Sequence, residues 1–491
     1  MNTAICLHMN YYRLLTILLS LCCIVCSAQK IQYSKSVLKT PGAGELQLLA
    51  NINGFHHLLY LAPGNKPVVY VFNDQLQLHT TRELNIRFPE KCDIRMLQLR
   101  DHYLLYMHAF QPSYHQLIRI NREGSLKDVS YLLTDPADSL WNKSTATFQL
   151  FNNNNNLSLI AHTYHSQLKK IRSTIVNFTD DNKKSITQIL FPFDLKYDDL
   201  KEATLQENQL LILKTSKDDD EKNILSFYKI DLHTSLFFSK QFESGKYVYF
   251  NPKFRYNPDD SSFFLYSILK TPLGYRGANP GMFMASLNST LNEIVPVQTL
   301  ANIFRNNAAS AFMIEKTNTL GWVSSFYLQP KSYSNNSNLD KSSVLPRFTP
   351  PTADFTPYVP EVGLNAFSSN SNSNFKPTAV LMTLLNNNFE RIKDSLVKND
   401  GNYYKIHPWP YAHFKMQNRS YLLVIEELVA RKRGLLLVYP GEQNHFETIP
   451  LRVQSSYNFL LPQLQVVENE YIIVPYINKK EIGLLKVTFT N

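Results

Sequence analysis

The sequence predicts an all-β protein folded as a β-propeller, a ring of four-stranded antiparallel sheets called blades. Three observations carry this prediction. Short segments rich in aliphatic and aromatic residues alternate with turns that contain Asn, Asp or Glu along nearly the whole chain. One arrangement of such segments recurs eight times, at intervals of about 50 residues. Windows with the periodicity of an amphipathic helix are nearly absent.

Each repeat begins with a candidate hairpin, made of a half-apolar segment, a polar turn and a longer apolar segment. In chain order, the eight hairpins cover residues 46–62, 94–110, 146–164, 202–214, 253–269, 310–328, 412–428 and 462–477. A third apolar segment follows each hairpin, at residues 68–72, 116–120, 173–178, 225–230, 282–287, 379–385, 434–439 and 483–489. A fourth, weaker segment usually comes next, so each repeat supplies the four strands of one blade.

The spacing between repeats is regular except at one place. The second strands begin near Leu58, Tyr103, Leu157, Leu210, Phe263, Trp322, Tyr421 and Tyr471, at spacings of 45, 54, 53, 53, 59, 99 and 50 residues. A Ser-, Asn- and Pro-rich stretch of 46 residues, 331–376, lies inside the longest spacing, which falls to 53 without it. Its few aliphatic residues predict a flexible insertion outside the core.

The eighth repeat has three strands and no fourth, and residues 31–39 form a lone strand-like segment before the first repeat. We therefore expect eight four-stranded blades, with residues 31–39 pairing beside residues 482–489 as the outer strand of the last blade. This pairing of the N- and C-terminal strands would close the ring and leave no open edge. Seven blades is the first alternative, and two tandem β-sandwiches is the second.

The first 28 residues have the pattern of a secretory signal peptide. Arg13 precedes an apolar run and the small residues Ser27 and Ala28. The junction between Ala28 and Gln29 resembles those of exported proteins from Bacteroidota-like bacteria, and the whole pattern resembles a secreted bacterial β-propeller. We expect residues 29–491 to form one exported domain that is periplasmic, cell-surface-associated or secreted. No later stretch reaches the roughly 18 apolar residues of a membrane span.

Composition excludes several classes of stabilisation and function. Only Cys92 remains after the signal peptide, so the mature chain has no intramolecular disulfide and depends on its hydrophobic core. The formal net charge of +10 comes from scattered basic residues without a stripe of interleaved aromatics, so we expect no nucleic-acid partner. No nucleotide-binding, metalloprotease, hydrolase-elbow or EF-hand motif is present. We expect a monomer without cofactor or metal.

Strand direction predicts the side of the ring that binds a ligand. The link from the second to the third strand of a blade, and the link into the next blade, both return to one side, which we call face one. Its links are the long ones, including residues 270–281, residues 331–376 and the basic residues 430–434. Function tends to be carried by long loops on a rigid scaffold, so we expect face one to be the working face.

The aromatic segment "HPWPYAHF", residues 407–414, leads into the innermost strand of the seventh blade, at the face-one mouth of the central channel. The candidate ligand-binding residues share this position or border it: His407, Trp409, Tyr411, His413, Tyr249, Tyr457, Arg431 and Arg433. Such aromatic side chains could stack on sugars or grip a peptide. The alternative is that they plug the channel and pack between blades. His407 and His413 would lie about 20 Å apart on a strand, too far to share a metal ion.

The function expected from the sequence is non-catalytic binding or scaffolding, with a glycan or a peptide or protein ligand on an aromatic-lined face. The alternative is a carbohydrate-active enzyme, a glycoside hydrolase or lyase, with carboxylates in the central channel. Such chemistry needs two carboxylates that face a shared substrate. The innermost strands offer Asp93, Asp199 and Glu202, and nothing in their spacing pairs them. No motif assigns a catalytic residue, and the propeller pattern itself carries no functional residues across.

Overall fold

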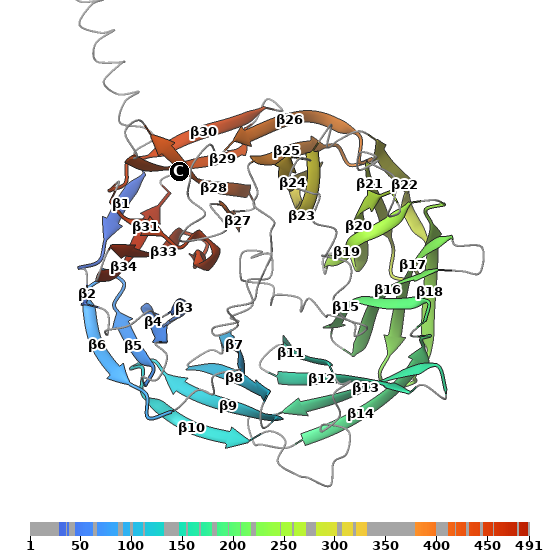
Figure 1. Ribbon diagram of the computed structural model, residues 1–491, viewed down its shortest axis with the longest axis horizontal. Coiled ribbons are helices and arrows are strands. Elements are labelled where there is room, and N and C mark those ends of the chain that lie inside the picture. Colours follow the sequence, from blue (N-terminus) through green and yellow to red (C-terminus); the bar gives the residue numbers. More distant parts are fainter. Residues whose placement is uncertain are drawn as a thin grey trace, which may run out of the picture.

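The computed structural model shows a ring of eight β-sheets around a central axis (Figure 1), and we call the inner side of the ring its channel side. It describes residues 29–35, 37–38, 45–61, 66–86, 92–98, 102–110, 113–131, 147–153, 156–165, 168–178, 184–194, 196–206, 208–217, 222–245, 247–257, 260–271, 281–301, 307–317, 321–330, 379–398, 411–417, 419–428, 432–441, 445–454, 456–478 and 481–489. Residues 1–28, for which the sequence predicts a signal peptide, and the predicted insertion at residues 331–376 lie outside these residues.

In each of the first seven blades, four antiparallel strands follow one another in chain order from the channel to the outer wall (Figure 1). The first blade has β3 (Glu45–Ile52), β4 (Phe55–Leu61), β5 (Val68–Phe72) and β6 (Leu78–Glu83). The second has β7 (Cys92–Gln98), β8 (His102–Phe110), β9 (Ser113–Asn121) and β10 (Leu126–Tyr131). The third has β11 (Thr147–Asn153), β12 (Asn156–His165), β13 (Lys170–Phe178) and β14 (Lys184–Pro192).

The next four blades repeat this order. Blade four has β15 (Asp198–Gln206), β16 (Gln209–Lys217), β17 (Asn223–Asp231) and β18 (Phe237–Glu243). Blade five has β19 (Val248–Asn257), β20 (Ser262–Lys270), β21 (Gly281–Leu287) and β22 (Glu293–Ala301). Blade six has β23 (Asn307–Thr317), β24 (Gly321–Pro330), β25 (Ala379–Leu385) and β26 (Arg391–Lys398). Blade seven has β27 (Tyr411–Met416), β28 (Arg419–Leu428), β29 (Lys432–Pro440) and β30 (Phe446–Leu451).

The eighth blade joins the two ends of the chain. Its strands, from the channel outward, are β31 (Asn458–Phe459) with β32 (Gln465–Val467), then β33 (Tyr471–Asn478), β34 (Glu481–Thr488), and β1 (Lys30–Tyr33) with β2 (Val37–Leu38). β1 pairs antiparallel with β34 from Lys30↔Thr488 to Tyr33↔Leu485, and β2 continues at Val37↔Ile482. The eight blades and the terminal closure predicted from the sequence are therefore confirmed, against seven blades or two sandwiches.

The innermost strand of blade eight differs from the other seven because it is interrupted. A 3₁₀ turn, η5 (Leu461–Gln463), separates β31 from β32, and it contains Pro462. Proline has no backbone N–H to donate to a neighbouring strand, and here it lies within the turn that interrupts the pairing with β33. The sequence pattern alone does not reveal this break.

Burial follows the position of a strand within its blade. The middle strands β5, β21 and β25 are buried along their whole length, whereas the outer strands β6 and β18 are mostly exposed. Neighbouring blades cover both faces of the middle strands, which explains why these segments are apolar throughout rather than alternating. The core is therefore a series of clusters between blades, such as the one that joins Leu213 of blade four to Phe263 and Leu265 of blade five.

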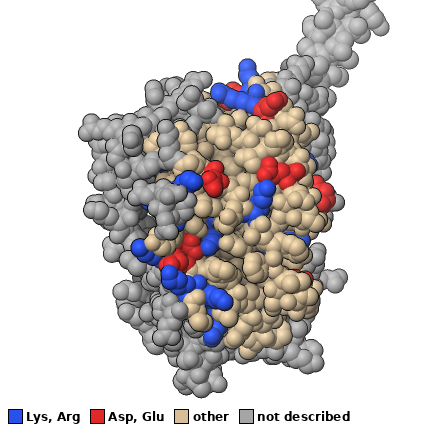
Figure 2. Space-filling view, turned by 90° about the vertical axis from the view of Figure 1, so that its right-hand side faces the viewer, with Lys and Arg blue, Asp and Glu red and all other residues tan. Residues whose placement is uncertain are grey.

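The outer wall carries charges of both signs and some exposed apolar side chains. Figure 2 shows basic and acidic groups next to one another on a largely uncharged surface, with no single basic stripe on this side. Lys240 of β18 and Glu293 of β22 form an ion pair of 2.9 Å between blades four and five. Leu236, Phe237 and Phe238 form a run of three exposed apolar residues on this wall. No helix in the described residues is long and apolar enough to cross a membrane.

Candidate functional site

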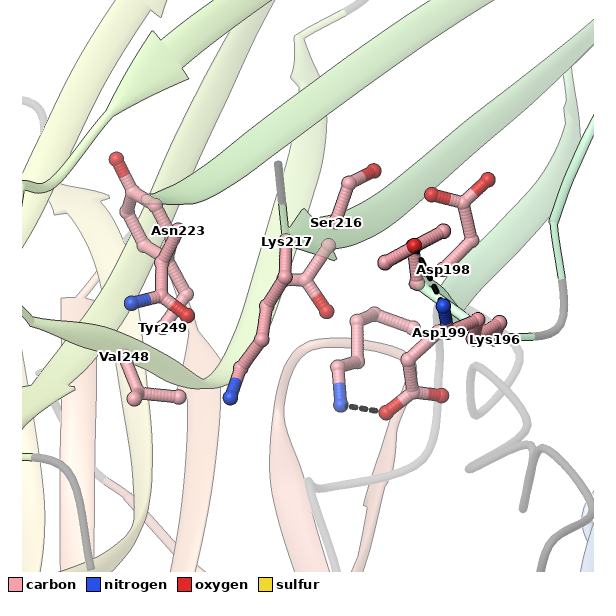
Figure 3. A pocket seen from close by; sticks show the side chains of 11 residues that line it. Lys196, Asp198, Asp199, Ser216, Lys217, Asn223, Val248 and Tyr249 are labelled. Atoms are coloured by element: carbon pink, nitrogen blue, oxygen red, sulfur yellow. Dashed lines mark hydrogen bonds and ion pairs between the residues drawn. The ribbon is translucent and has the colours of Figure 1, made fainter. Parts of the chain in front are cut away.

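A cleft of about 360 Å³ opens on face one between blades four and five (Figure 3). Its walls come from the start of β15, the end of β16, the start of β17 and the start of β19, all of which meet on this side of the ring. The lining residues are Lys196, Tyr197, Asp198, Asp199, Lys201, Thr215, Ser216, Lys217, Asn223, Val248 and Tyr249. Almost all carry a polar group, so the cleft is suited to a polar ligand.

Two consecutive carboxylates at the start of β15 have different surroundings. Both line the cleft, but neighbouring residues of a strand point to opposite faces of the sheet, so their carboxylates point in different directions. Asp198 Oδ2 accepts hydrogen bonds from Lys214 Nζ at 2.6 Å and from the backbone N–H of Asp194 at 2.9 Å. The side chains of Asp198 and Lys214 are only 9% and 8% exposed. This buried pair fixes the first residue of β15 against β16.

Asp199 instead faces the cleft, where its side chain is 51% exposed and forms an ion pair with Lys201. Thr215, which lies directly opposite Asp199 in the register of β15 and β16, lines the same cleft. Lys217 lies two residues further along β16, so it shares that face of the sheet. Figure 3 shows Lys217 between the Asp199 side of the cleft and the side formed by Asn223 and Tyr249.

A β-bulge gives Lys201 its direction. The register of β15 with β16 passes from Leu200↔Lys214 to Glu202↔Leu213, which leaves Lys201 without an opposing residue. An extra residue of this kind changes the direction of the side chains near it, and bulges are common beside functional sites. β19 has a similar irregularity between Phe250 and Lys253. The two innermost strands that border the cleft therefore both depart from regular pairing close to it.

The opposite wall of the cleft is rigid. Tyr249 is only 2% exposed, and its hydroxyl donates a hydrogen bond of 3.2 Å to the carbonyl oxygen of Phe242. Burial raises the pKa of Tyr249 well above its ordinary value. The carbonyl oxygen of Asn223 accepts a hydrogen bond of 3.1 Å from the backbone N–H of Ser244. Because hydrogen bonds to Phe242 and Ser244 restrain Tyr249 and Asn223, this wall of the cleft is held in one conformation.

Glu202 lies deeper on the same strand and is almost completely buried between blades four and five. Its Oε2 accepts a hydrogen bond of 3.0 Å from the backbone N–H of Phe254 on β19. Burial raises the pKa of Glu202, although the charge of Lys253 opposes this effect. Of the three carboxylates considered from the sequence, Asp199 borders the cleft and Glu202 links two blades. Asp93 lies on β7, and its side chain is outside the described residues.

Tyr411 and His413, at the end of the aromatic segment, are buried between blades six and seven. They are 3% and 2% exposed. Tyr411 packs in a cluster with Val380 and Met382 of blade six. His413 Nε2 is 2.6 Å from the hydroxyl of Ser325 in β24. Both side chains therefore occupy packing positions in this structure, and a contact of either with a ligand stays a prediction.

Tyr457 is partly exposed beside β31 on face one. Its ring lies parallel to that of Tyr476, with centroids 4.2 Å apart and an interplanar angle of 4°. Tyr33 from β1 meets both rings edge-on, at 5.4 Å from Tyr457 and 5.9 Å from Tyr476. The backbone N–H of Gln454 donates to the hydroxyl of Tyr33 at 2.8 Å. We call these three side chains the tyrosine stack; it holds Tyr457 in place on face one.

The remaining candidates from the sequence cannot be placed. His407, Trp409 and Arg431 lie outside the described residues. Arg433 lies on β29 opposite Glu427, but its side chain is not among those described. Binding by these residues stays a prediction. The sequence analysis did not select Lys196, Lys201 or Lys217, because isolated lysines near a polar link have no motif; the change of charge along "KYDDLK" at residues 196–201 was the available signal.

Comparison with known proteins gives similarity of fold only. No family model and no curated protein sequence matches the chain. Among solved structures, the WD40 domain of SCAP from fission yeast covers 94% of this chain and 98% of its own, at 8% identity and a TM-score of 0.43. The propeller domain of the trilobed protease from Pyrococcus furiosus covers 81% and 95%, at 9% identity and a TM-score of 0.35. An oligogalacturonate lyase in complex with manganese covers 94% and 99%, at 8% identity and a TM-score of 0.35. Similarities this low carry no argument about function.

Proposed function

We propose that the protein acts outside the cytoplasm as a monomeric, non-catalytic binding propeller, whose face one binds a glycan or a peptide in the cleft between blades four and five. The observation that carries this proposal is the cleft itself, which is concave, polar and built on strands that are fixed from behind. Ligand sites are concave, largely preformed and placed where structural units meet. Tyr457 on the opposite side of the channel adds an aromatic surface to the same face.

The arrangement of carboxylates favours binding over catalysis. Hydrolysis of a glycosidic bond needs two carboxylates on either side of one bond. Asp198 and Asp199 point to opposite faces of β15, and each is already in an ion pair with a lysine. Glu202 accepts a hydrogen bond from the backbone N–H of Phe254 in blade five. Of these three carboxylates, only Asp199 is therefore largely exposed to a ligand.

A second candidate function, that of a glycoside hydrolase or lyase, is favoured by one observation. Burial raises the pKa of Glu202, and a carboxylic acid that keeps its proton is what a general acid requires. Turnover of generic glycosidase or lyase substrates that disappears in Glu202→Gln and in Asp199→Asn, with both variants folded, would establish this function instead of the binding function.

The binding proposal is tested by filling the cleft. Thr215→Trp places a large side chain on the face of β16 that lines the cleft, and Thr81→Trp places the same side chain on the exposed outer strand β6 as a control. Purified mature protein is first screened on glycan and peptide arrays, and the dissociation constants of the positives are measured by calorimetry. We expect Thr215→Trp to abolish binding while Thr81→Trp retains it. Equal binding by both variants would disprove a role for this cleft.

A further inference from the structure

We infer that the ligand of the cleft is a glycan with two neighbouring hydroxyl groups, held by the Asp199 and Lys201 side chains. This inference rests on the proposed function and names the ligand class within it. Asp199 and Lys201 form an ion pair on the rim of the cleft, and their side chains remain 51% and 26% exposed. A carboxylate acceptor and an ammonium donor therefore lie next to each other and can both be reached from the cleft.

Adjacent hydroxyls on a sugar ring match this arrangement. Each hydroxyl can donate one hydrogen bond and accept others. One hydroxyl can therefore donate to the carboxylate of Asp199 while its neighbour accepts from the ammonium of Lys201. Hydrogen bonds with an ionised partner are stronger than those between neutral groups. In a trans peptide group the N–H and the C=O point in opposite directions, so an extended backbone does not present a donor and an acceptor side by side to one ion pair.

The rim is ordered before a ligand arrives. The bulge on β15 gives Lys201 its direction, and the ion pair with Asp199 holds its amine. Just behind it, the buried pair of Asp198 with Lys214 fixes the strand. A lysine that is already restrained loses less conformational entropy on binding than a free one. The bulge therefore serves to build a fixed donor and acceptor pair on the cleft rim.

The rest of the lining has the same chemistry. Lys196 Nζ donates to the Tyr197 hydroxyl at 2.7 Å, which makes a second neighbouring donor and acceptor pair on the rim. Thr215 and Ser216 add hydroxyl groups, and Val248 adds one apolar surface for the C–H groups of a sugar. The lining is dominated by hydroxyl, amine and carboxylate groups. It therefore suits a ligand rich in hydroxyl groups better than it suits a peptide, because most peptides are anchored by large side chains in apolar pockets.

The experiment uses the mature chain and a panel of neutral hexose and deoxyhexose tetrasaccharides, their uronate counterparts and a random peptide array. Each neutral glycan that binds is compared with analogues that lack one ring hydroxyl at a time. We expect removal of either of two adjacent hydroxyls to weaken binding about tenfold or more, the loss typical of a hydrogen bond to a charged group. Asp199→Asn and Lys201→Met should lower affinity similarly and reduce this discrimination.

The control is a second lysine and carboxylate pair that lies far from the cleft. Lys240→Met and Glu293→Gln break the ion pair on the outer wall and should leave glycan affinity unchanged. The discrimination between hydroxyl analogues is measured on the unmodified protein, so it stands even if a cleft variant fails to fold.

Several outcomes would overturn the inference and separate it from the proposed function. Glycan binding that is insensitive to every single-hydroxyl removal contradicts the inference, as does binding of peptides alone or of uronates that depends on their carboxylate and not on their ring hydroxyls. If such binding is nevertheless abolished by Thr215→Trp, the proposed function stands and only the ligand class is wrong. If no ligand depends on the cleft, both fail.

Discussion

Lys486, in the last strand of the chain, donates a hydrogen bond of 2.8 Å from its Nζ to Asp74 Oδ1 in the first blade. Its ammonium also lies 3.7 Å from the ring centroid of Tyr471, whose hydroxyl donates to the same carboxylate oxygen at 2.8 Å. The contact therefore connects blade one to blade eight at the place where the ring closes. It adds side-chain bonds to the backbone ladder between β1 and β34.

The first prediction concerns this contact. Although burial acts to raise it, the pKa of Asp74 is held below its ordinary value by the hydrogen bonds from Lys486 and Tyr471. A lowered carboxylate pKa stabilises the folded state above the unfolded value of about 3.9, and this stabilisation is lost as the pH falls through the folded value. Asp74→Asn should lower the melting temperature at pH 7, and the difference from the parent should shrink as the pH falls below the unfolded value of about 3.9. A difference independent of pH would show that the charge is not responsible.

The second prediction concerns the strand that closes the ring. Deletion of residues 31–39 removes the ladder with β34 and exposes that strand as an edge. We expect a sharp fall in melting temperature and increased aggregation, measured by calorimetry and light scattering. Deletion of residues 331–376, which no described strand includes, is the matched control and should have a small effect. An unchanged melting curve after the first deletion would contradict the role of this closure.

The third prediction concerns Gly483, which lies against the tyrosine stack. A Cβ at this position would lie 2.4 Å from Cζ of the fully buried Tyr476. Gly483→Ala should therefore destabilise the fold by about 1–3 kcal/mol, as overpacking of a core does. Gly441→Ala is the control, because a Cβ there meets only the flexible, partly exposed side chain of Glu447. Chemical denaturation of the two variants measures the difference, and equal stabilities would count against the packing described for Tyr476.

The fourth prediction concerns two histidines that are buried as neutral rings. Burial lowers the pKa of His56 and of His162 to about 3. Since the unfolded value is about 6.5, the unfolded state takes up a proton below that pH while the buried ring stays neutral, so the folded state loses stability as the pH falls from 6.5 towards 3. Each histidine should contribute a loss of about 1.4 kcal/mol per pH unit in that range. His162→Gln should make the stability profile between pH 6.5 and 4.5 less steep; a parallel profile would refute the assignment.

The fifth prediction separates packing from binding at the aromatic segment. The sequence leads one to expect that Tyr411→Ala weakens ligand binding with little change in melting temperature. Because Tyr411 is only 3% exposed and packs against blade six, we now expect its truncation to destabilise the protein by about 3–5 kcal/mol, as for other buried aromatic residues. Trp409→Ala keeps the expectation of weakened binding. Normal stability of Tyr411→Ala would restore the original interpretation of both residues.

The sequence was sufficient to predict the fold because the strands of each blade have a recognisable pattern of apolar residues. The middle strands are covered on both faces, so segments such as "VVYVF" and "AVLMTLL" are continuously apolar, and their spacing reveals the repeat. The closure was predictable because the last repeat lacks a strand that residues 31–39 supply. The break at η5 was not predictable, since it depends on where Pro462 falls in the pairing between the innermost strand and β33.

The cleft could not be predicted in the same way. It depends on contacts between blades and on a bulge of one residue at Lys201, which changes side-chain direction without any sequence signature. Lys214 illustrates the difficulty, because a lysine at the end of "LLILK" is typical of an exposed strand end, yet it is nearly buried against Asp198. The identity of face one followed from strand direction alone, and the lining of its cleft required the side-chain arrangement.

The pairing of Lys30 with Thr488 has a consequence for the order of folding. β1 is synthesised before any of the blades, whereas its partner strand β34 follows all the other described strands along the chain. Bringing two ends this distant together costs roughly 5 kcal/mol of chain entropy, although this term rises only slowly with length. We therefore expect the first seven blades to form before closure. In that interval the apolar surface between blades one and eight, including Leu58 and Leu484, is open to misassembly. Slow refolding that depends on protein concentration would be its signature.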